Sequence, residues 1–528
     1  MSSLEPVALP AGFTPYVWAP GSADVAARHG LRVEQVLRFD QNTPPLPGVP
    51  QIPLAESFAR LNEYPDGTYR ELRQSAAAYV GLGEDSWQQV VVGAGADDLI
   101  LLCARAFLRP GRRAAIETPT YVVYEEASQL AGAEIGREVE GADLVWRCNP
   151  NNPTGAITPS EELVELARSV PGAPVVVDEA YIEYGGESVV PCLGAAPNLI
   201  ALRTMSKAFG FASLRVGYAV AAPGVAAMLE ERRAPAPVAG PAARIAAAAL
   251  REPRLDVAAT IAERERVAGA LRAAGFDVPV SGGNFVYVRT ERPLAAELET
   301  HGLIVRSVAG GIRIGIRNPT DDDVLLRALG IEIEQRQSRS ATVIRTTTET
   351  ALRVTLELDG SGRARVATGI GFLDHLLTLL AFHAGFDLDL LAGGDVDVDE
   401  HHTVEDVLAS LGDALAQALG SRDGLTRYGA ATVPMDEARA VAAVDLVRRP
   451  HAEIGLGFAG DRVGGLAVTL LPHALERFAM QAACTVHVES SGDDDHHVAE
   501  AAFKALGRAL REACSPGRAG STSTKGAA

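Results

Sequence analysis

The sequence predicts an α/β domain with a mostly parallel sheet, followed by a duplicated α+β domain. Three observations support this. Strand-like and helix-like stretches alternate from the start to about residue 332, which is typical of α/β proteins. After residue 343, apolar and polar residues alternate as in antiparallel strands. One helical motif occurs twice in this second part. The length of 528 residues is sufficient for two such domains.

In the first part, short apolar runs end in turn-forming residues. VVVGAG (90–95) reads as a strand that leads into a helix over 97–107. PVVVDEAY (174–181) and NLIALRT (198–204) read as further buried strands, with Ala/Leu/Glu-rich helices such as 161–169 and 256–274 between the strands. Ligands of such sheets collect where strands end and helices begin, so we expect the site there.

The segment EIEQRQSRSAT (332–342) is polar and has no apolar pair. We place the junction in it and predict domains over 1–335 and 341–528.

The second part contains an internal repeat. HHTVEDVLASLGDALAQAL begins at His401 and HHVAEAAFKALGRALREA begins at His496, and the two align at an offset of 95 residues. Stretches 351–358 and 386–391 alternate as strands do. Two copies of one unit predict duplicated halves packed about a pseudo-twofold axis.

Composition excludes several classes of protein. Apolar residues make up 47% and charged residues 22%, which is ordinary for packed domains. A net charge of −19 repels phosphate backbones and anionic lipid, so neither nucleic acid nor membrane is an expected partner. The N-terminus lacks a signal-peptide pattern, and the five cysteines are scattered, which favours free thiols in the cytoplasm.

Lysine is rare, and this singles out one residue. A pyridoxal phosphate enzyme needs a lysine for its Schiff base, and Lys207 is the only lysine before position 504. Asp178 ends an apolar strand, where an anion would keep a pyridine nitrogen protonated. The turn-rich NPNNPTG (149–155) precedes it, and the GAGADD turn (93–98) offers backbone N–H groups to a phosphate. The order and spacing of these features favour a pyridoxal phosphate site.

The first part resembles the fold-type I pyridoxal phosphate aminotransferases, and within them histidinol-phosphate aminotransferase. The resemblance covers about 35–320. Besides NPNNPTG and VVDEAY, it includes RTMSKAFGFASLRVGY (203–218), DQNTPPLPG (40–48), YPDGTYRELR (64–73), ETPTYVVY (117–124), NFVYVR (284–289) and IVRSVAGGIRIGI (304–316).

This resemblance implies a role for each matching residue. Lys207 would form the Schiff base and then carry the proton between the substrate α-carbon and the cofactor. Asp178 would pair with the pyridine nitrogen. Other residues would hold the rest of the cofactor and the substrate: Tyr181 and Asn152 the phenolic oxygen, Tyr121 the ring face, Ser206, Arg215 and the backbone of Ala96 and Asp97 the phosphate, Tyr64 the phosphate site of a neighbouring subunit in a dimer, and Arg313 and Arg306 the substrate carboxylate or phosphate.

The two HHxxE motifs predict metal binding. On a helix, the first histidine and the glutamate of each motif share a face, and the second histidine lies nearby. With His375 and His487 added, six imidazoles and two carboxylates are available, enough for two sites of three nitrogens and one oxygen for Mn²⁺, Fe²⁺ or Zn²⁺. His383, His451 and His473 do not fit the pattern and are interpreted as ordinary histidines.

The second part resembles imidazoleglycerol-phosphate dehydratase over about 342–526. The matching motifs include RTTTET (345–350), TGIGFLDHLL (368–377), RYGAATVPMDEA (427–438) and STKG (523–526). The resemblance implies a homo-oligomer, because the family builds 24-subunit shells with sites between subunits, and it implies two Mn²⁺ per site. It further implies that Glu349 is a proton-transfer group. The implied metal ligands are His375, His401, His402, Glu405, His487, His496, His497 and Glu500. The residues implied to bind the substrate phosphate are Arg427, Arg449, Ser523 and Lys525.

Together the two resemblances predict a bifunctional enzyme of histidine biosynthesis with small-molecule substrates. One half would dehydrate imidazole glycerol phosphate, and the other would transaminate the product, imidazole acetol phosphate, with glutamate to give histidinol phosphate. Two alternatives remain: the first half acts on another amino acid or amino-acid phosphate, or one half is catalytically inactive.

Overall fold

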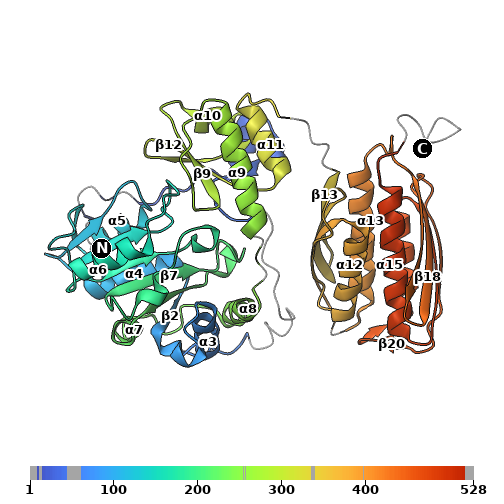
Figure 1. Cartoon of the computed structure of the whole chain (residues 1–528), viewed down its shortest axis with the longest axis horizontal. Helices are drawn as coiled ribbons and strands as arrows, with labels where there is room; N and C mark the ends of the chain where they lie inside the picture. The colour runs from blue at the N-terminus through green and yellow to red at the C-terminus, as the bar shows by residue number, and fades with distance from the viewer. Residues whose placement is uncertain are drawn as a thin grey trace, which may run out of the picture. The chain divides into compact units, whose positions relative to one another are not determined.

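The computed structural model describes residues 9–10, 13, 15–44, 61–253, 255, 257–333, 339–396 and 398–517 (Figure 1). The described residues form two compact units, one ending at residue 333 and the other beginning at residue 339. Each unit is described by itself below. Among the described residues, no helix combines the length and apolar character that a membrane span requires.

The first unit is built on a seven-stranded sheet. All its strands are parallel except β8, which runs antiparallel to both neighbours. The order across the sheet is β2 (Val90–Gly93), β8 (Gly217–Ala221), β7 (Leu199–Thr204), β6 (Val175–Asp178), β5 (Leu144–Cys148), β3 (Arg113–Ile116) and β4 (Glu134–Gly136).

Helices cover this sheet because its central strands are apolar on both faces. Every residue of β2, β6, β7 and β8 is buried. Leu99 and Cys103 of α4 and Tyr124 of α5 pack on strand residues such as Ile116 and Trp146. The helices of this part are α3 (Arg70–Tyr79), α4 (Ala96–Phe107), α5 (Val123–Leu130), α6 (Ser160–Ser169), α7 (Pro223–Glu230) and α8 (Gly240–Arg251).

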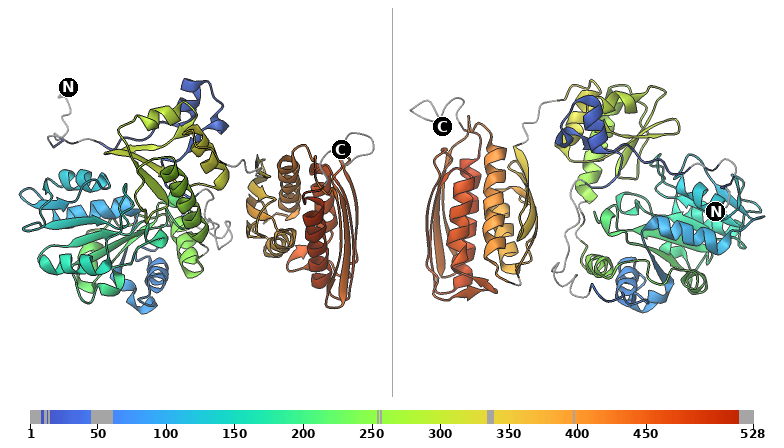
Figure 2. Two further views of the ribbon diagram at one scale, coloured as in Figure 1. Left: turned by 45° about the horizontal axis from the view of Figure 1, so that its top comes forward. Right: turned by 180° about the vertical axis from the view of Figure 1, so that it is seen from behind.

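A smaller subdomain completes the first unit (Figure 2). Its antiparallel sheet has the order β11 (Arg306–Val308), β12 (Gly311–Gly315), β9 (Phe285–Arg289), and it packs with α9 (Val257–Ala273), α10 (Leu294–Glu299) and α11 (Pro319–Ala328). The N-terminal α1 (Ser22–His29) precedes β1 (Leu37–Arg38), which pairs in parallel with β10 (Leu303–Ile304). This pairing places the segment after β1 beside β12, where Arg313 donates a hydrogen bond to the Asp40 carbonyl oxygen.

The second unit has two four-stranded sheets with helices between them (Figure 1). One continuous apolar core joins both sheets to the helices. The first sheet has the order β13 (Ser340–Thr346), β14 (Thr350–Glu357), β16 (Asp387–Gly394), β15 (Ala364–Ala367); the second has β17 (Tyr428–Met435), β18 (Ala438–Asp445), β22 (Thr485–Ser491), β19 (His451–Leu456). The helices are α12 (Gly371–Ala384), α13 (His401–Leu419), α14 (Leu470–Gln481) and α15 (Asp495–Ala513).

The two sheets have the same topology, which confirms the predicted duplication. Each begins with an antiparallel hairpin, β13–β14 or β17–β18, and each ends with a parallel pair, β15 with β16 or β19 with β22. The repeat glycines mark equivalent close contacts between helices. A Cβ on Gly412 would lie 2.5 Å from the carbonyl oxygen of Phe478, and one on Gly507 would lie 2.7 Å from that of Leu380.

Candidate active sites

Lys207 follows strand β7, at the edge of the sheet where the parallel strands end. Its Nζ donates a hydrogen bond to the carbonyl oxygen of Gln41 at 3.0 Å and lies 5.6 Å from the centroid of the Tyr181 ring. Burial, together with the positive charge of Arg313, lowers the pKa of Lys207 to about 7. A large fraction of this amine is therefore neutral at neutral pH.

Asp178 ends the neighbouring strand β6 and is buried. Its carboxylate accepts hydrogen bonds from the Tyr124 hydroxyl at 2.7 Å and from the Ala180 N–H at 3.0 Å. Burial raises the pKa of Asp178 to about 6, although both hydrogen bonds act in the opposite direction. Tyr124 is itself stacked on Trp146, with ring centroids 5.1 Å apart. Two hydrogen bonds therefore fix the carboxylate at the end of β6.

Arg313 connects β12 to the segments that follow β1 and β5. Its Nη1 donates to the side-chain oxygen of Asn152 at 2.7 Å, and Nη2 donates to the backbone of Asp40. Its buried Nε has no hydrogen-bond partner among the described residues, so one guanidinium donor is available to a ligand. Arg306 is the register partner of Arg313 in the β11–β12 pair, and it donates to the Val17 carbonyl oxygen at 2.7 Å.

The residues expected to bind the cofactor phosphate lie around the first turn of α4. Tyr121 donates to one carboxylate oxygen of Asp97 at 2.9 Å, and Arg215 pairs with the other at 3.1 Å. Gly95 precedes the helix with a φ of +87°, and a Cβ there would lie 2.7 Å from the Arg215 guanidinium. This helix start lies beside Arg215, and among the described residues no side chain caps it at Gly95, so it suits an anion. Ser206 accepts a hydrogen bond from the Thr204 hydroxyl at 3.0 Å.

The structure therefore brings Lys207, Asp178, Asn152, Tyr181 and Arg313 into one connected region, whereas Tyr64 is 94% exposed. Two further residues of this region, Tyr124 and Asn42, were not among the predicted site residues. Tyr124 holds Asp178, and the Asn42 side chain donates to the Tyr181 hydroxyl at 3.2 Å. Both lie inside motifs that carried the resemblance, and this was the only signal available for them.

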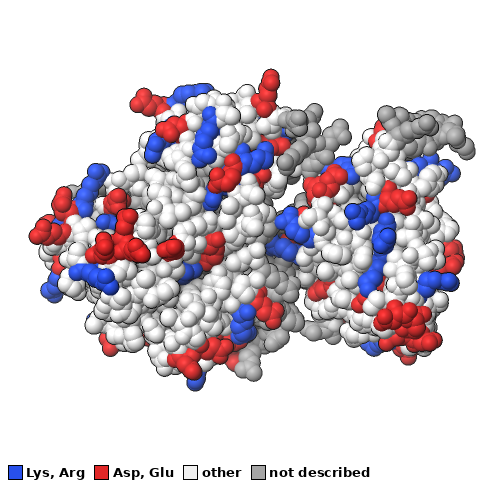
Figure 3. Space-filling model, in the orientation of Figure 1, with Lys and Arg blue, Asp and Glu red and all other residues white. Residues whose placement is uncertain are grey.

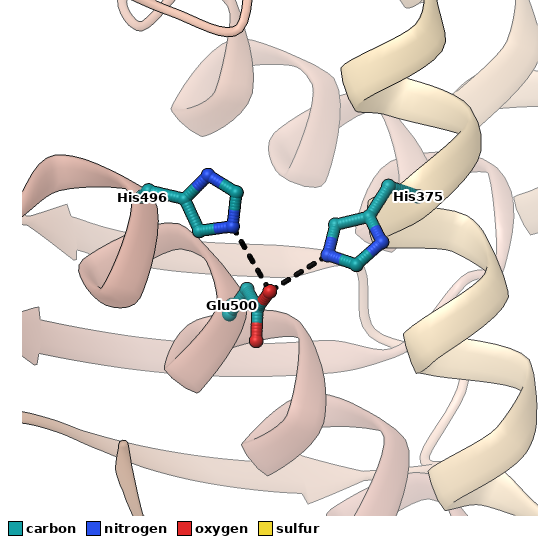
Figure 4. Close-up of side chains that lie close together, drawn as sticks. All are labelled: His375, His496 and Glu500. Carbon is teal, nitrogen blue, oxygen red and sulfur yellow. Dashed lines mark hydrogen bonds and ion pairs between the residues drawn. The ribbon is translucent and has the colours of Figure 1, made fainter. Parts of the chain in front are cut away.

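In the second unit, His375, His496 and Glu500 form a cluster (Figure 4). Oε1 of Glu500 lies 2.7 Å from His375 Nε2 and 3.0 Å from His496 Nε2. Its other oxygen pairs with Lys504 at 2.5 Å. Desolvation alone would raise the pKa of Glu500, but Lys504 and the two histidines outweigh it and lower the pKa to about 2. The carboxylate thus presents one oxygen to the histidines.

A second cluster consists of His401, Glu405 and His473. Oε2 of Glu405 lies 3.3 Å from His401 Nε2 and 3.2 Å from His473 Nε2. Arg477 Nε lies 2.9 Å from the other carboxylate oxygen. Although desolvation opposes it, the pKa of Glu405 is lowered by His473 and Arg477. The cluster reproduces the first one on the other pair of helices, α13 and α14.

The membership of this cluster differs from the predicted ligand set. His473, interpreted from the sequence as an ordinary histidine, belongs to it. His487 is in neither cluster. It lies on β22, where alternate residues are exposed, with its ring 5.8 Å from that of His451. A signal for His473 was present: a helix with LDHLL precedes the first HHxxE motif, and a helix with LPHAL precedes the second.

The second histidine of each HHxxE motif contacts other carboxylates. His402 Nδ1 lies 3.2 Å from Asp395 and 3.6 Å from Glu349. His497 Nδ1 lies 2.9 Å from Glu437. The pKa of His402 is raised by its hydrogen bond to Asp395, and that of His497 by its hydrogen bond to Glu437. Each cluster therefore offers two nitrogens and one oxygen, with His402 and His497 outside.

Of the predicted phosphate-binding residues, Arg427 is buried and pairs with Asp445 at 2.7 Å, whereas Arg449 is exposed. Ser523 and Lys525 lie outside the described residues. On the face drawn in Figure 3, basic side chains are interspersed with acidic ones in both units.

Each unit matches a known protein family. The model of the family "Aminotransferase class I and II" matches residues 31–329, and that of "Imidazoleglycerol-phosphate dehydratase" matches 368–510. A dehydratase of Magnetococcus marinus is 51% identical over 178 residues, 34% of this chain and 90% of that protein. The chain belongs to both families. A dehydratase of Chloroflexus aggregans is 53% identical over 174 residues, 33% of this chain and 85% of that protein.

Solved structures resemble the aminotransferase unit in fold. Histidinol-phosphate aminotransferase of Sinorhizobium meliloti, solved with pyridoxal 5′-phosphate, has a TM-score of 0.54 and 24% identity, covering 62% of this chain and 97% of that one. Aspartate aminotransferase of Thermotoga maritima has a TM-score of 0.51 and 22% identity, covering 58% of this chain and 93% of that one. The fold-type I prediction is thereby confirmed. Enzymes of the first family use pyridoxal phosphate, and those of the second are metal-dependent.

Proposed function

We propose that this chain catalyses two consecutive steps of histidine biosynthesis. The dehydratase unit would convert imidazole glycerol phosphate to imidazole acetol phosphate. The aminotransferase unit would convert that ketone to histidinol phosphate with glutamate as amino donor. The observation that carries the proposal is the presence, in one chain, of a lysine–aspartate site in an aminotransferase fold and paired histidine–glutamate clusters in a dehydratase.

The aminotransferase residues fit pyridoxal phosphate. Bound there, the cofactor would supply an electron sink for the substrate α-carbon. Lys207, with its lowered pKa, would attach the cofactor and then carry a proton to and from that carbon. Asp178 would hold the pyridine nitrogen in its protonated form. Arg313, whose Nε is free of partners among the described residues, and Arg306 would bind the acid groups of the substrate.

The dehydratase residues fit two Mn²⁺ ions. Imidazole nitrogens with a single carboxylate oxygen are suitable donors for a divalent first-row ion. Lys504 and Arg477 occupy the second oxygen of each glutamate, so each offers only one oxygen to a metal. Bound there, the ions would supply positive charge beside the imidazole ring of the substrate, held by the histidines and glutamates of the two clusters. Glu349, half-exposed at 3.6 Å from His402, would transfer the proton.

We further propose a cytoplasmic homo-oligomer. Each cluster contains three donors, and the remaining histidines, His402 and His497, lie outside both clusters. Neighbouring copies would therefore supply the fourth donors. In the aminotransferase unit, the exposed Tyr64 would reach the phosphate site of a dimer partner.

A direct assay tests the pathway assignment. Purified chain supplied with Mn²⁺, pyridoxal phosphate, imidazole glycerol phosphate and glutamate should produce histidinol phosphate. Lys207→Ala should stop at imidazole acetol phosphate, and the His401→Ala/His496→Ala double variant should transaminate added ketone but not dehydrate. Rapid turnover of another keto acid, with none of imidazole acetol phosphate, would favour a different amino-acid substrate. Protein that binds neither the vitamin nor metal would contradict the proposal.

A further inference from the structure

The two hairpins that open the sheets of the dehydratase unit carry equivalent glutamates. In the first hairpin, Thr346 pairs with Ala351, and Glu349 lies in the turn between them. In the second, Met435 pairs with Ala438, and Glu437 lies in the turn. Both turns face the second histidine of an HHxxE motif, His402 or His497. The duplication therefore places one hairpin carboxylate beside each of these histidines.

The two glutamates make different contacts. Both oxygens of Glu437 are engaged: Oε1 accepts the Asp494 N–H at 2.9 Å, and Oε2 lies 2.9 Å from His497 Nδ1. The Glu349 carboxylate stands 3.6 Å from His402 Nδ1, beyond hydrogen-bond distance, and its side chain is 50% exposed. In that half, Asp395 on the loop before α13 takes the Nδ1 contact at 3.2 Å. The same contact is thus made by Glu437 in one half and Asp395 in the other.

A carboxylate at Nδ1 determines what the other ring nitrogen can do. A neutral imidazole has one N–H and one lone pair, and a carboxylate acceptor holds the N–H at Nδ1. The lone pair is then at Nε2, and the ring orientation is fixed. On His497, Nε2 has only the Asp436 carboxylate near it among the described contacts, at 3.7 Å. This nitrogen is free of hydrogen bonds there and is suited to binding a metal.

We propose that Glu437 and Asp395 are positioning residues that hold His497 and His402 with Nε2 free for a metal ion. Glu437 therefore does not share the proton-transfer role of its equivalent Glu349. Its two hydrogen bonds also tie the hairpin turn to the start of α15, where Asp494 accepts the His496 N–H at 2.8 Å. This inference rests on the proposed metal-dependent dehydration.

The test measures Mn²⁺ binding to metal-stripped full-length protein by calorimetry and by the electron paramagnetic resonance of free Mn²⁺. Glu437→Ala should weaken one of the two Mn²⁺ sites by about 10- to 100-fold and leave the other unchanged. Glu437→Gln should recover part of the loss, because its amide oxygen can still accept the Nδ1 proton. Asp395→Ala and Asp395→Asn should behave in the same way at the other site.

Glu489→Gln, at an exposed position on β22, is the matched control and should bind both ions as the wild type does. Unchanged Mn²⁺ affinity in Glu437→Ala and Asp395→Ala, with two ions bound by the wild type, would overturn the inference and leave the proposed function intact. Loss of both ions together, not restored by Glu437→Gln, would indicate a merely structural role and would also overturn it. A wild type that binds no Mn²⁺ would reject the inference and the metal-dependent function together.

Discussion

The amine of Lys207 illustrates how neighbouring groups prepare a single residue for chemistry. Because burial and Arg313 lower its pKa to about 7, the neutral, nucleophilic form becomes common within the physiological range. We expect cofactor-free protein to capture pyridoxal phosphate faster as pH rises from about 6 to about 8, and then to level off. Stopped-flow absorbance measures this rate. In Arg313→Met, the rise should shift to higher pH, and an unshifted profile would contradict the role of Arg313.

The buried carboxylate of Asp178 lowers the stability of the cofactor-free protein when it is charged. Its pKa in the folded protein, about 6, exceeds the ordinary aspartate value of 3.8, so its contribution to stability is present below about pH 4 and is lost as pH rises through about 6. Asp178→Asn should therefore stabilise cofactor-free protein above about pH 6 by up to about 3 kcal/mol, with no gain near pH 4.

Urea unfolding followed by tryptophan fluorescence can measure this effect in the full chain. The three tryptophans, Trp18, Trp87 and Trp146, all lie in the aminotransferase unit, so their emission reports on that unit. Asp277→Asn, at an exposed residue, serves as the control and should change little. The same Asp178 variant should bind pyridoxal phosphate more weakly. An Asp178→Asn variant less stable than the wild type at pH 8 would show that the buried carboxylate does not lower stability there.

At the scale of elements, helices α12 and α14 occupy equivalent places and each supplies one histidine to a cluster. His473→Ala should remove one Mn²⁺ per chain and abolish dehydration, because the cluster then retains only His401 and Glu405. His487→Ala should retain both ions. Metal analysis after gel filtration distinguishes the two variants. If His487→Ala lost a metal and His473→Ala did not, the ligand set predicted from the sequence would be favoured instead.

The equivalent glycines of α13 and α15 allow these helices to pack closely on α14 and α12. An added methyl group at Gly412 or Gly507 would lie within 2.7 Å of a backbone carbonyl oxygen, and a backbone atom cannot move aside easily. Gly412→Ala and Gly507→Ala should each destabilise the dehydratase unit by about 1–3 kcal/mol. Calorimetric melting measures the loss. Gly269→Ala, inside α9 with open space around it, is the control and should be neutral or slightly stabilising.

The order of elements could be predicted from the sequence because each depends on local patterns. The buried strands ending at Asp178 and Thr204 follow from apolar runs, and the duplication follows from the two HHxxE motifs. Which histidines meet could not be derived in the same way. His487 is close to the second motif in sequence, but the side of β22 on which it lies depends on strand register. For His473 the match of LPHAL to LDHLL is a signal, but its contact with His401 and Glu405 depends on the packing of α14 on α13.

Long-range contacts account for the remaining unpredicted part of the aminotransferase site. Asn42 donates to Tyr181, and the Asn284 side chain donates to the Asn42 carbonyl oxygen at 2.9 Å. These residues meet because β1 pairs with β10, which is distant in the sequence. No local pattern encodes such a pairing.

For the whole molecule, two reagents should inactivate the two activities separately. A metal chelator should abolish dehydration and leave transamination unchanged, since both candidate metal clusters found among the described residues lie in the dehydratase unit. Borohydride should reduce the cofactor link at Lys207 and have the reverse effect. Assays of each half-reaction on the treated full chain measure this. Loss of both activities with either reagent would show that the units depend on one another.

In each of the two histidine–glutamate clusters, a basic side chain pairs with the glutamate, but the two basic side chains come from helices that are not equivalent. Glu500 is met by Lys504 from its own helix, whereas Glu405 is met by Arg477 from α14. The two halves of the duplicated fold therefore pair their equivalent glutamates with cations at different positions. A substitution at Lys504 or at Arg477 would therefore change the charge around one cluster and leave the other cluster as it is, so the two clusters can be adjusted independently.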